Sequence, residues 1–178
     1  MDYKEVPYTT YLNQTLSRLV HPGLLLVSAA GDGRPNAMTI GWGTVGVIWG
    51  KPIFVVLVRP SRYTYSLLEA SDSFTVCVPS RAMHDAVDFC GTRSGRDYDK
   101  FEECDLTALP STQVGAPGIA GCPVVYECQV VHTNDVIPAN LAATIKDSAY
   151  PRGDFHRLYF GEILAVRALP DAAELLAE

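Results

Sequence analysis

The sequence predicts a mainly β fold, an antiparallel barrel of about six strands with short helices inserted between them. Six segments have strand-like alternation or β-branched runs, and the helical segments between them do not recur in a regular β-α-β order. No G-x-G-x-x-G follows a strand, so a dinucleotide-binding parallel sheet is not indicated. The length of 178 residues predicts one domain, with a helix over about 8–20 and a barrel over about 23–168.

The first elements are a packing helix and a hairpin. Residues 8–20 place their apolar side chains on one helical stripe, and Pro22 and Gly23 end the helix. Residues 24–30 and 36–44 are strand-like, and the turn Gly31-Asp32-Gly33 between them predicts an antiparallel hairpin.

The strand predicted over 53–59 is apolar on both faces, as in Ile-Phe-Val-Val-Leu-Val. One face can line a barrel interior. The other face needs a helix or a second subunit, because a monomer seldom exposes so wide an apolar surface. We therefore expect a homodimer.

Three helices are expected in the middle of the chain. Residues 61–70 form one helix with Ser61 as its cap, and a second begins after Ser80 and has Gly91 in its C-terminal turn. A short helical stretch lies within 97–103, in a Gly- and Pro-rich surface connection over 92–121. Between the first two helices, residues 73–78 predict a strand.

Two more strands follow, over 124–132 and 158–166. Gly161-Glu162 interrupts the last strand. Either a bulge or a charge that points inward to a specific partner explains this interruption.

Composition excludes several partners. The net charge of −6 and the pI of about 5.1 disfavour nucleic acid and anionic membranes. The apolar runs are far shorter than the roughly 20 residues that span a bilayer, and no leader is visible, so we expect a cytoplasmic protein. Five cysteines without C-x-x-C spacing predict reduced, mostly buried thiols, and four scattered histidines predict no metal site.

The strand predicted over 36–44 has one face of small residues, Ala37, Thr39, Gly41 and Gly43. Such a face lets a flat molecule approach the main chain and bond to its amides. Close strand packing inside a narrow barrel explains the same pattern, and the segment alone does not separate the two interpretations.

The segment Arg59-Pro60-Ser61-Arg62-Tyr63-Thr64 lies where a strand passes into a helix. Free amides at a helix start, two arginines and two hydroxyl groups form a cradle for a phosphate. Ordinary capping with solvated arginines is the alternative.

The loop over 90–101 contains Gly91, Gly95 and three basic side chains. It is either a join between two helices, with Ser94 and Asp97 as a capping box, or a ligand loop. In the second case Lys100 and Phe101 contact an anionic aromatic ligand.

Together these blocks resemble the flavin reductase-like, FMN-binding split-barrel proteins, which include the flavoredoxins. The resemblance runs in order through residues 36–44, 59–65, 90–101 and 161–162 and covers about 23–166. It implies a six-stranded Greek-key split barrel that dimerises, with FMN near the subunit interface. One departure is Gly41, where relatives often have serine.

The resemblance also implies the contacts of each residue with FMN. The isoalloxazine and ribityl chain would be bordered by Met38, Thr39, Trp42, Gly43 and Thr44. The phosphate would be held by Arg59, Ser61, Arg62, Tyr63 and Thr64. The remaining side would be closed by Cys90, Gly91, Ser94, Lys100 and Phe101.

The implied activity is NAD(P)H-dependent flavin reduction, with a hydride passed to the flavin and electrons to free flavin, a partner protein or a small acceptor. His156 is the one candidate catalytic side chain near the nicotinamide or the flavin edge, the alternative being a surface histidine at a strand end. A non-catalytic FMN-binding electron carrier or sensor is a second hypothesis. A split-barrel oxidase of a phosphorylated pyridine is a third, although the second phosphate site that it needs is not identified.

Overall fold

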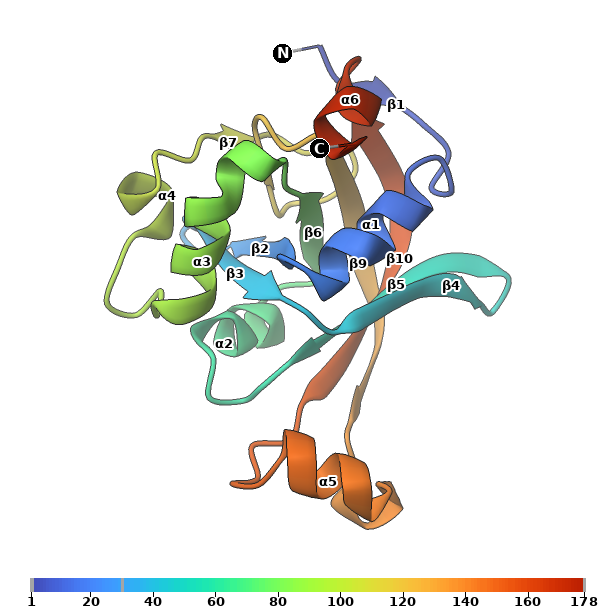
Figure 1. Cartoon of the computed structure of the whole chain (residues 1–178), viewed down its shortest axis with the longest axis vertical. Helices are drawn as coiled ribbons and strands as arrows, with labels where there is room; N and C mark the ends of the chain where they lie inside the picture. The colour runs from blue at the N-terminus through green and yellow to red at the C-terminus, as the bar shows by residue number, and fades with distance from the viewer. Residues whose placement is uncertain (1, 30, 178) are drawn as a thin grey trace.

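The computed structural model describes residues 2–29 and 31–177. Within these residues, one antiparallel sheet has the strand order β3-β2-β6-β9-β10-β5-β4, and β1 pairs with β10. The sheet curls round on itself, and α1 lies across its front in Figure 1. The strands are β1 (Lys4–Glu5), β2 (Leu24–Ala29), β3 (Pro35–Ile40), β4 (Gly43–Ile48), β5 (Lys51–Val58), β6 (Ser73–Val78), β9 (Val124–Asp135) and β10 (Arg157–Ala168); β7 (Ala108–Leu109) and β8 (Gly118–Ile119) form a separate pair.

The helices are short and lie between the strands. They are α1 (Leu12–Val20), α2 (Tyr63–Ala70), the 3-10 turn η1 (Arg81–Met83), α3 (His84–Thr92), α4 (Lys100–Glu103), the 3-10 turn η2 (Pro138–Asn140), α5 (Ala143–Ala149) and α6 (Ala172–Ala177). α5 lies at the far tip of β9 and β10, away from the other helices (Figure 1). None of the helices in the described residues is long and apolar enough to cross a membrane.

Alternate side chains of β2 point into two separate hydrophobic cores. Leu24 and Leu26 point into the barrel and pack in the larger cluster with Phe54, Phe74 and Tyr126. Leu25 and Val27 point to the other face, where they pack with α3 and α4 side chains in a second cluster. Because both faces are covered, the strand is apolar throughout and its register is fixed from both sides.

The predicted strands are found as β2, β3, β5, β6, β9 and β10, and a mainly antiparallel β fold with short helices is confirmed. The single strand expected over 36–44 is wrong. β3 ends at Ile40, and β4 begins at Gly43 and pairs with β5. A two-residue turn joins β4 to β5, with positive φ at Trp49 (54°) and Gly50 (71°). Hairpins favour such turns because the twist of the turn matches the right-handed twist of the two strands.

The predicted helix caps are also corrected. Ser61 does not cap α2, because its hydroxyl donates to Asp154 Oδ2 at 2.6 Å and Arg62 occupies the N-cap position. Ser80 precedes η1 and makes no capping bond. Gly91 lies in the last turn of α3, as predicted. The short helix α4 takes its cap from Asp99 instead of Ser94.

The bulge expected at Gly161 is confirmed by a register shift between β10 and β9 at Phe160/Gly161. A Cβ at Gly161 would lie 2.5 Å from Phe74 Cζ, so the core ring itself requires glycine there. Glu162 points to a specific partner as well, with its carboxylate 2.6 Å from Lys51 Nζ.

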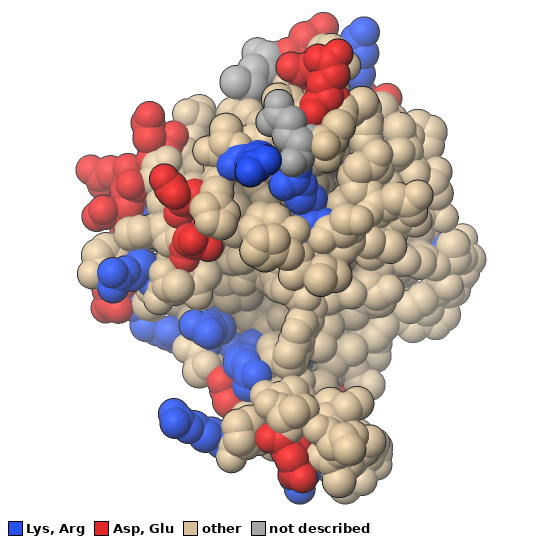
Figure 2. Space-filling view, viewed as in Figure 1, with Lys and Arg blue, Asp and Glu red and all other residues tan. Residues whose placement is uncertain are grey.

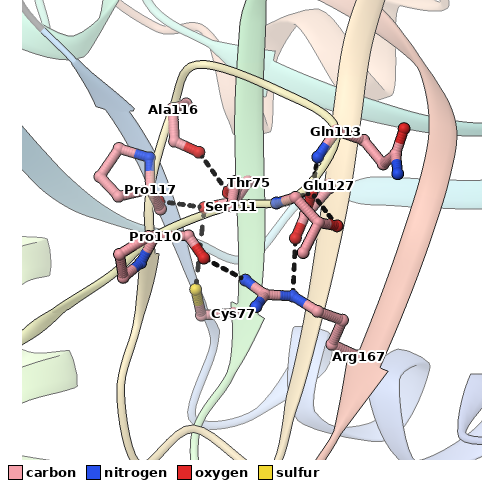
Figure 3. A network of polar contacts seen from close by, with 10 residues as sticks. Thr75, Cys77, Pro110, Ser111, Gln113, Ala116, Pro117, Glu127 and Arg167 are labelled. Carbon is pink, nitrogen blue, oxygen red and sulfur yellow. Dashed lines mark hydrogen bonds and ion pairs between the residues drawn. The ribbon is translucent and has the colours of Figure 1, made fainter. Parts of the chain in front are cut away.

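A buried ion pair joins the long strands to the connection around residues 110–117 (Figure 3). Glu127 on β9 is fully buried, with Oε1 at 2.7 Å from Arg167 Nε on β10. Its Oε2 accepts the backbone N–H of Thr112 (2.9 Å) and of Gln113 (2.7 Å). The carboxylate therefore joins β10 and the 110–117 connection to β9. All five cysteines are free, and four are buried, as expected from their spacing.

Candidate functional site

Three hollows join into one groove beside β3, α2 and α3. The Trp42 cavity has a volume of about 190 Å³, and the Ser94 cavity has about 80 Å³. They share Met38, Arg62 and Gly91 as a common wall. The third, the Tyr98 cavity of about 370 Å³, shares Tyr63, Gly95 and Lys100 with the Ser94 cavity. An elongated ligand can therefore extend from one cavity to the next.

The Trp42 end of the groove and its middle differ in chemistry. Apolar and aromatic side chains predominate at one end, where the Trp42 cavity is lined by Met38, Thr39, Ile40, Gly41, Trp42, Leu57, Arg59, Arg62, Gly91 and His156. Basic and hydroxyl side chains predominate in the middle, where the Ser94 cavity is lined by Met38, Ser61, Arg62, Tyr63, Thr64, Cys90, Gly91, Arg93, Ser94, Gly95 and Lys100. Lys and Arg side chains gather over α2 and the nearby end of α3 in Figure 2.

Arg62 lies where the two cavities meet and occupies the N-cap of α2. No side chain caps the first turn of this helix. Within the described residues, the Arg62 guanidinium has no recorded hydrogen bond or ion pair and is exposed. An anion placed here would meet a free guanidinium and open backbone amides together.

Lys100 is a buried cation on the wall of the Ser94 cavity. Its Nζ donates to Ala37 O (2.9 Å) and Cys90 O (2.8 Å), and so links β3 to α3. No carboxylate of the described residues is recorded as its ion-pair partner, and burial lowers the pKa of the amine. Burial also raises the pKa of Cys90 to about 12, so this residue presents a thiol at neutral pH.

Arg59 is placed at the aromatic end of the groove. Its guanidinium donates to Ala149 O and Asp154 O, both at 2.9 Å. It also lies 5.9 Å from the Trp42 ring centre and 5.0 Å from that of Tyr150. These contacts fix the 149–154 loop beside the Trp42 cavity, and the phosphate contact predicted for Arg59 stays a prediction.

His156 lies beneath Trp42, with ring centres 4.9 Å apart. Its Nδ1 is 2.8 Å from the Tyr150 hydroxyl, and only 8% of the residue is exposed. Burial and the Arg59 charge lower the pKa of His156 to about 4. The imidazole is therefore neutral at pH 7, and the surface-histidine alternative is wrong.

The small-residue face of β3 is used for close packing along part of its length. Thr39 donates its hydroxyl to Val87 O of α3, and a Cβ at Gly91 would lie 3.3 Å from Thr39 Cβ. Ala37 is fully buried in the second core. The strand is accessible only toward the C-terminal end of β3, where Thr39, Ile40 and the following Gly41 line the Trp42 cavity.

A comparison with protein families matches residues 16–177 to the flavin reductase like domain. The chain belongs to the flavin reductase-like domain family. An uncharacterized protein of Archaeoglobus fulgidus is 31% identical over 147 residues, which are 83% of this chain and 73% of that protein.

Solved structures of the flavin reductase-like family share the fold. The flavoredoxin of Desulfovibrio vulgaris (Miyazaki F) has a TM-score of 0.68 at 27% identity, over 84% of this chain and 70% of that chain. A split-barrel domain protein of Shewanella frigidimarina has a TM-score of 0.67 at 15% identity, over 89% and 74% of the two chains. The mainly β antiparallel architecture with short helices therefore matches split-barrel structures.

Most of the residues predicted to contact a cofactor lie together in this flavin reductase-like groove. The cavities bring together Met38, Thr39, Trp42, Arg59, Ser61, Arg62, Tyr63, Thr64, Cys90, Gly91, Ser94, Lys100 and His156. Three do not line them. Gly43 and Thr44 belong to β4, where they pair with Val56 and Val55, and Phe101 is buried in the second core.

Sequence reasoning missed several groove residues. Leu57, Arg93 and Gly95 line the groove without having been singled out, although each lies within two residues of a predicted position. Tyr150 was missed for a different reason. It reaches His156 and Arg59 only because the β9–β10 connection folds back, and no local pattern marks this contact.

Proposed function

We propose that this chain is an FMN-dependent oxidoreductase that takes a hydride from NADH or NADPH. The single observation that supports this most is the position of Arg62. Its guanidinium, which has no hydrogen-bond or ion-pair partner within the described residues, lies beside the cavity with the aromatic lining, at the start of a helix that no side chain caps. FMN has this shape and charge, with a flat ring at one end and a phosphate at the other. The membership in the flavin reductase-like family supports the same assignment.

The residues present fit FMN. The buried Lys100 ammonium has carbonyl partners only, so a phosphate in the Ser94 cavity would complement its charge. Arg62, Ser94 and Thr64 would hold that phosphate, and Met38, Thr39 and Trp42 would border the ring. Bound FMN would supply the two-electron chemistry between NAD(P)H and an acceptor.

The protein's part in this chemistry is binding and orientation. His156 and Trp42 shape the far end of the Trp42 cavity, and the neutral imidazole can hold a hydrogen bond without adding charge. Arg59 anchors the loop that carries Tyr150, so the wall behind His156 is fixed. No proton transfer by an acid–base pair is needed for hydride transfer.

Anaerobic mixing with NADH and with NADPH tests the activity. The FMN-loaded protein is expected to lose its visible flavin absorbance rapidly with at least one of them. An FMN-binding electron carrier is the second candidate, supported by the 27% identical flavoredoxin. FMN that binds tightly but bleaches with neither nucleotide would favour the carrier, and a protein that takes up no FMN would contradict both.

The variant Arg62→Ala tests the phosphate end of the groove. Loss of a charge-assisted contact, about 1.5–3 kcal/mol, is expected to weaken FMN binding roughly 10- to 100-fold. Flavin fluorescence titration measures this change, and circular dichroism should show an unaltered fold. Lys4→Ala, which removes the same charge from exposed β1, is the matched control and should leave affinity unchanged. Equal affinity of Arg62→Ala and wild type would remove Arg62 from the site.

A further inference from the structure

A separate cavity of about 480 Å³ lies between the end of α1 and the start of α3. We call it the Ser80 cavity, and its lining residues are Arg18, His21, Pro22, Ser80, Arg81 and His84. None of them lines the groove described above. The α1 and α3 helices that border it both face the viewer in Figure 1.

The lining of the Ser80 cavity is basic in a protein with a net charge of −6. Arg18 and Arg81 carry fixed positive charge, two histidines add nitrogen donors, and no carboxylate lines the cavity. His84 also contacts an acid outside the lining, with its Nε2 at 3.4 Å from Asp88 Oδ2. Guanidinium groups with imidazoles and a hydroxyl are the donor set that binds phosphate groups.

Ser80 adds a hydroxyl group to this lining. The residue is 7% exposed and occupies the N-cap of η1, where its side chain makes no capping bond. Its hydroxyl is therefore free to donate a hydrogen bond to an anion in the cavity.

The Ser80 cavity is a neighbour of the Trp42 cavity. Gly23, which follows the lining residue Pro22, packs so closely on Thr39 that a Cβ there would lie 2.7 Å from Thr39 Cγ2. Thr39 in turn lines the Trp42 cavity. α3 borders both, with His84 at one cavity and Gly91 at the other, seven residues or about 10 Å apart along the helix.

We propose that the Ser80 cavity binds the 2′-phosphate of NADPH and makes this chain selective for NADPH over NADH. The inference rests on the proposed function, in which the Trp42 cavity borders the flavin ring that accepts the hydride, so the nicotinamide must reach that cavity. A dinucleotide has one ribose and a pyrophosphate between its nicotinamide and its adenosine ribose, and this linker can extend along the roughly 10 Å of α3 that separates Gly91 from His84. NADH lacks the phosphate monoester, so it would leave Arg18, Arg81 and Ser80 without their ligand.

Calorimetric titration of the FMN-loaded protein with adenosine 2′,5′-bisphosphate and with adenosine 5′-monophosphate tests the site without any hydride transfer. The bisphosphate is expected to bind at least tenfold more tightly. Arg81→Ala should reduce bisphosphate affinity about tenfold or more and leave monophosphate affinity unchanged. Lys4→Ala, on exposed β1, is the control and should change neither.

Kinetics provide the second measurement. Arg81→Ala should raise KM for NADPH about tenfold or more, with kcat and the NADH parameters unchanged. Equal binding of the two adenosine phosphates, or an Arg81→Ala variant identical to wild type, would overturn the proposal. Inorganic phosphate that binds as tightly as the bisphosphate would indicate a free-phosphate site and also overturn it. Selective bisphosphate binding without flavin bleaching by either nucleotide would leave the Ser80 cavity supported and contradict the reductase function alone.

Discussion

The charge state of each groove residue is set by what surrounds it. His156 is enclosed by Trp42, Tyr150 and the Arg59 guanidinium, and therefore stays neutral at pH values where an exposed histidine begins to take up a proton. Lys100 lies equally deep but keeps two carbonyl acceptors. The groove thus presents positive charge at Arg62, Lys100 and Arg59, and His156 adds no charge at the Trp42 end.

The His156 environment predicts a pH effect on stability. The pKa of His156 is about 4 in the folded chain, against the usual 6.5 when unfolded. Between these pH values the unfolded state binds a proton that the folded state does not, so stability falls as the pH decreases from 6.5 to 4. Urea unfolding at pH 6.5 and 4.5 should show a smaller loss for His156→Gln than for wild type. An NMR titration midpoint near 6.5 for His156 in the folded protein would contradict this prediction.

At the residue scale, the chemistry of the site was largely predictable and its geometry was not. Side-chain type and spacing singled out Arg62 and Lys100, and the family resemblance added Ser94. All three line the Ser94 cavity, and their contacts with a cofactor stay predictions. The same local reasoning made Ser61 a helix cap and missed the acceptor that it uses, Asp154, which lies 93 residues away. Contacts of this separation leave no periodic signal.

At the element scale, the Glu127–Arg167 pair joins β9 to β10 and holds the 110–117 connection against the sheet (Figure 3). Such a pair is a weak source of net stability when intact. Removal of one charge is costly, because the other charge is left buried without compensation.

Glu127→Gln is therefore expected to destabilise the fold by roughly 3–5 kcal/mol. Glu162→Gln is the matched control. It removes a carboxylate from the partly exposed pair with Lys51 on the same sheet, and should cost less than about 1 kcal/mol. Chemical denaturation of both variants measures the difference. Equal destabilisation of the two variants would show that burial of the Glu127 pair is not the controlling factor.

Long strands with buried faces were predictable, and several shorter or exposed elements were missed, among them α6, although it buries Ala172 and Leu176. The core strands show alternation or continuous apolar runs because both barrel and helix layers select their side chains. The break between β3 and β4 was missed because residues 36–44 alternate without interruption. α5 has no buried residue, so no apolar stripe marks it in the sequence.

At the scale of the whole molecule, the β4–β5 hairpin exposes apolar side chains. Val47 is 64% exposed and Trp49 62%, and the Trp49 ring lies beside the rings of His132 and Phe160. β4 is also an edge strand. The strand whose second face was expected to need a helix or a second subunit, β5, is already buried within the chain over Ile53–Val56. We propose instead that two protomers meet at the β4–β5 hairpin, which would cover Val47 and Trp49.

Sedimentation velocity is expected to show a dimer for wild type and a monomer for Val47→Glu. Val20→Glu places the same charge at a still more exposed apolar site at the end of α1, and should remain dimeric. A wild-type protein that sediments as a monomer at micromolar concentration would contradict the proposal.

Because β3 lies between two cores, its register affects how the groove responds to heating. A slip of one residue would move Met38 out of the barrel and Ala37 into it, so both hydrophobic layers would lose their fit at once. The strand consequently has no partly shifted alternative at low energy. The wall of the groove should keep its shape during warming until the sheet itself melts, and hydrogen exchange at the amides of β3 should be as slow as at the centre of β6.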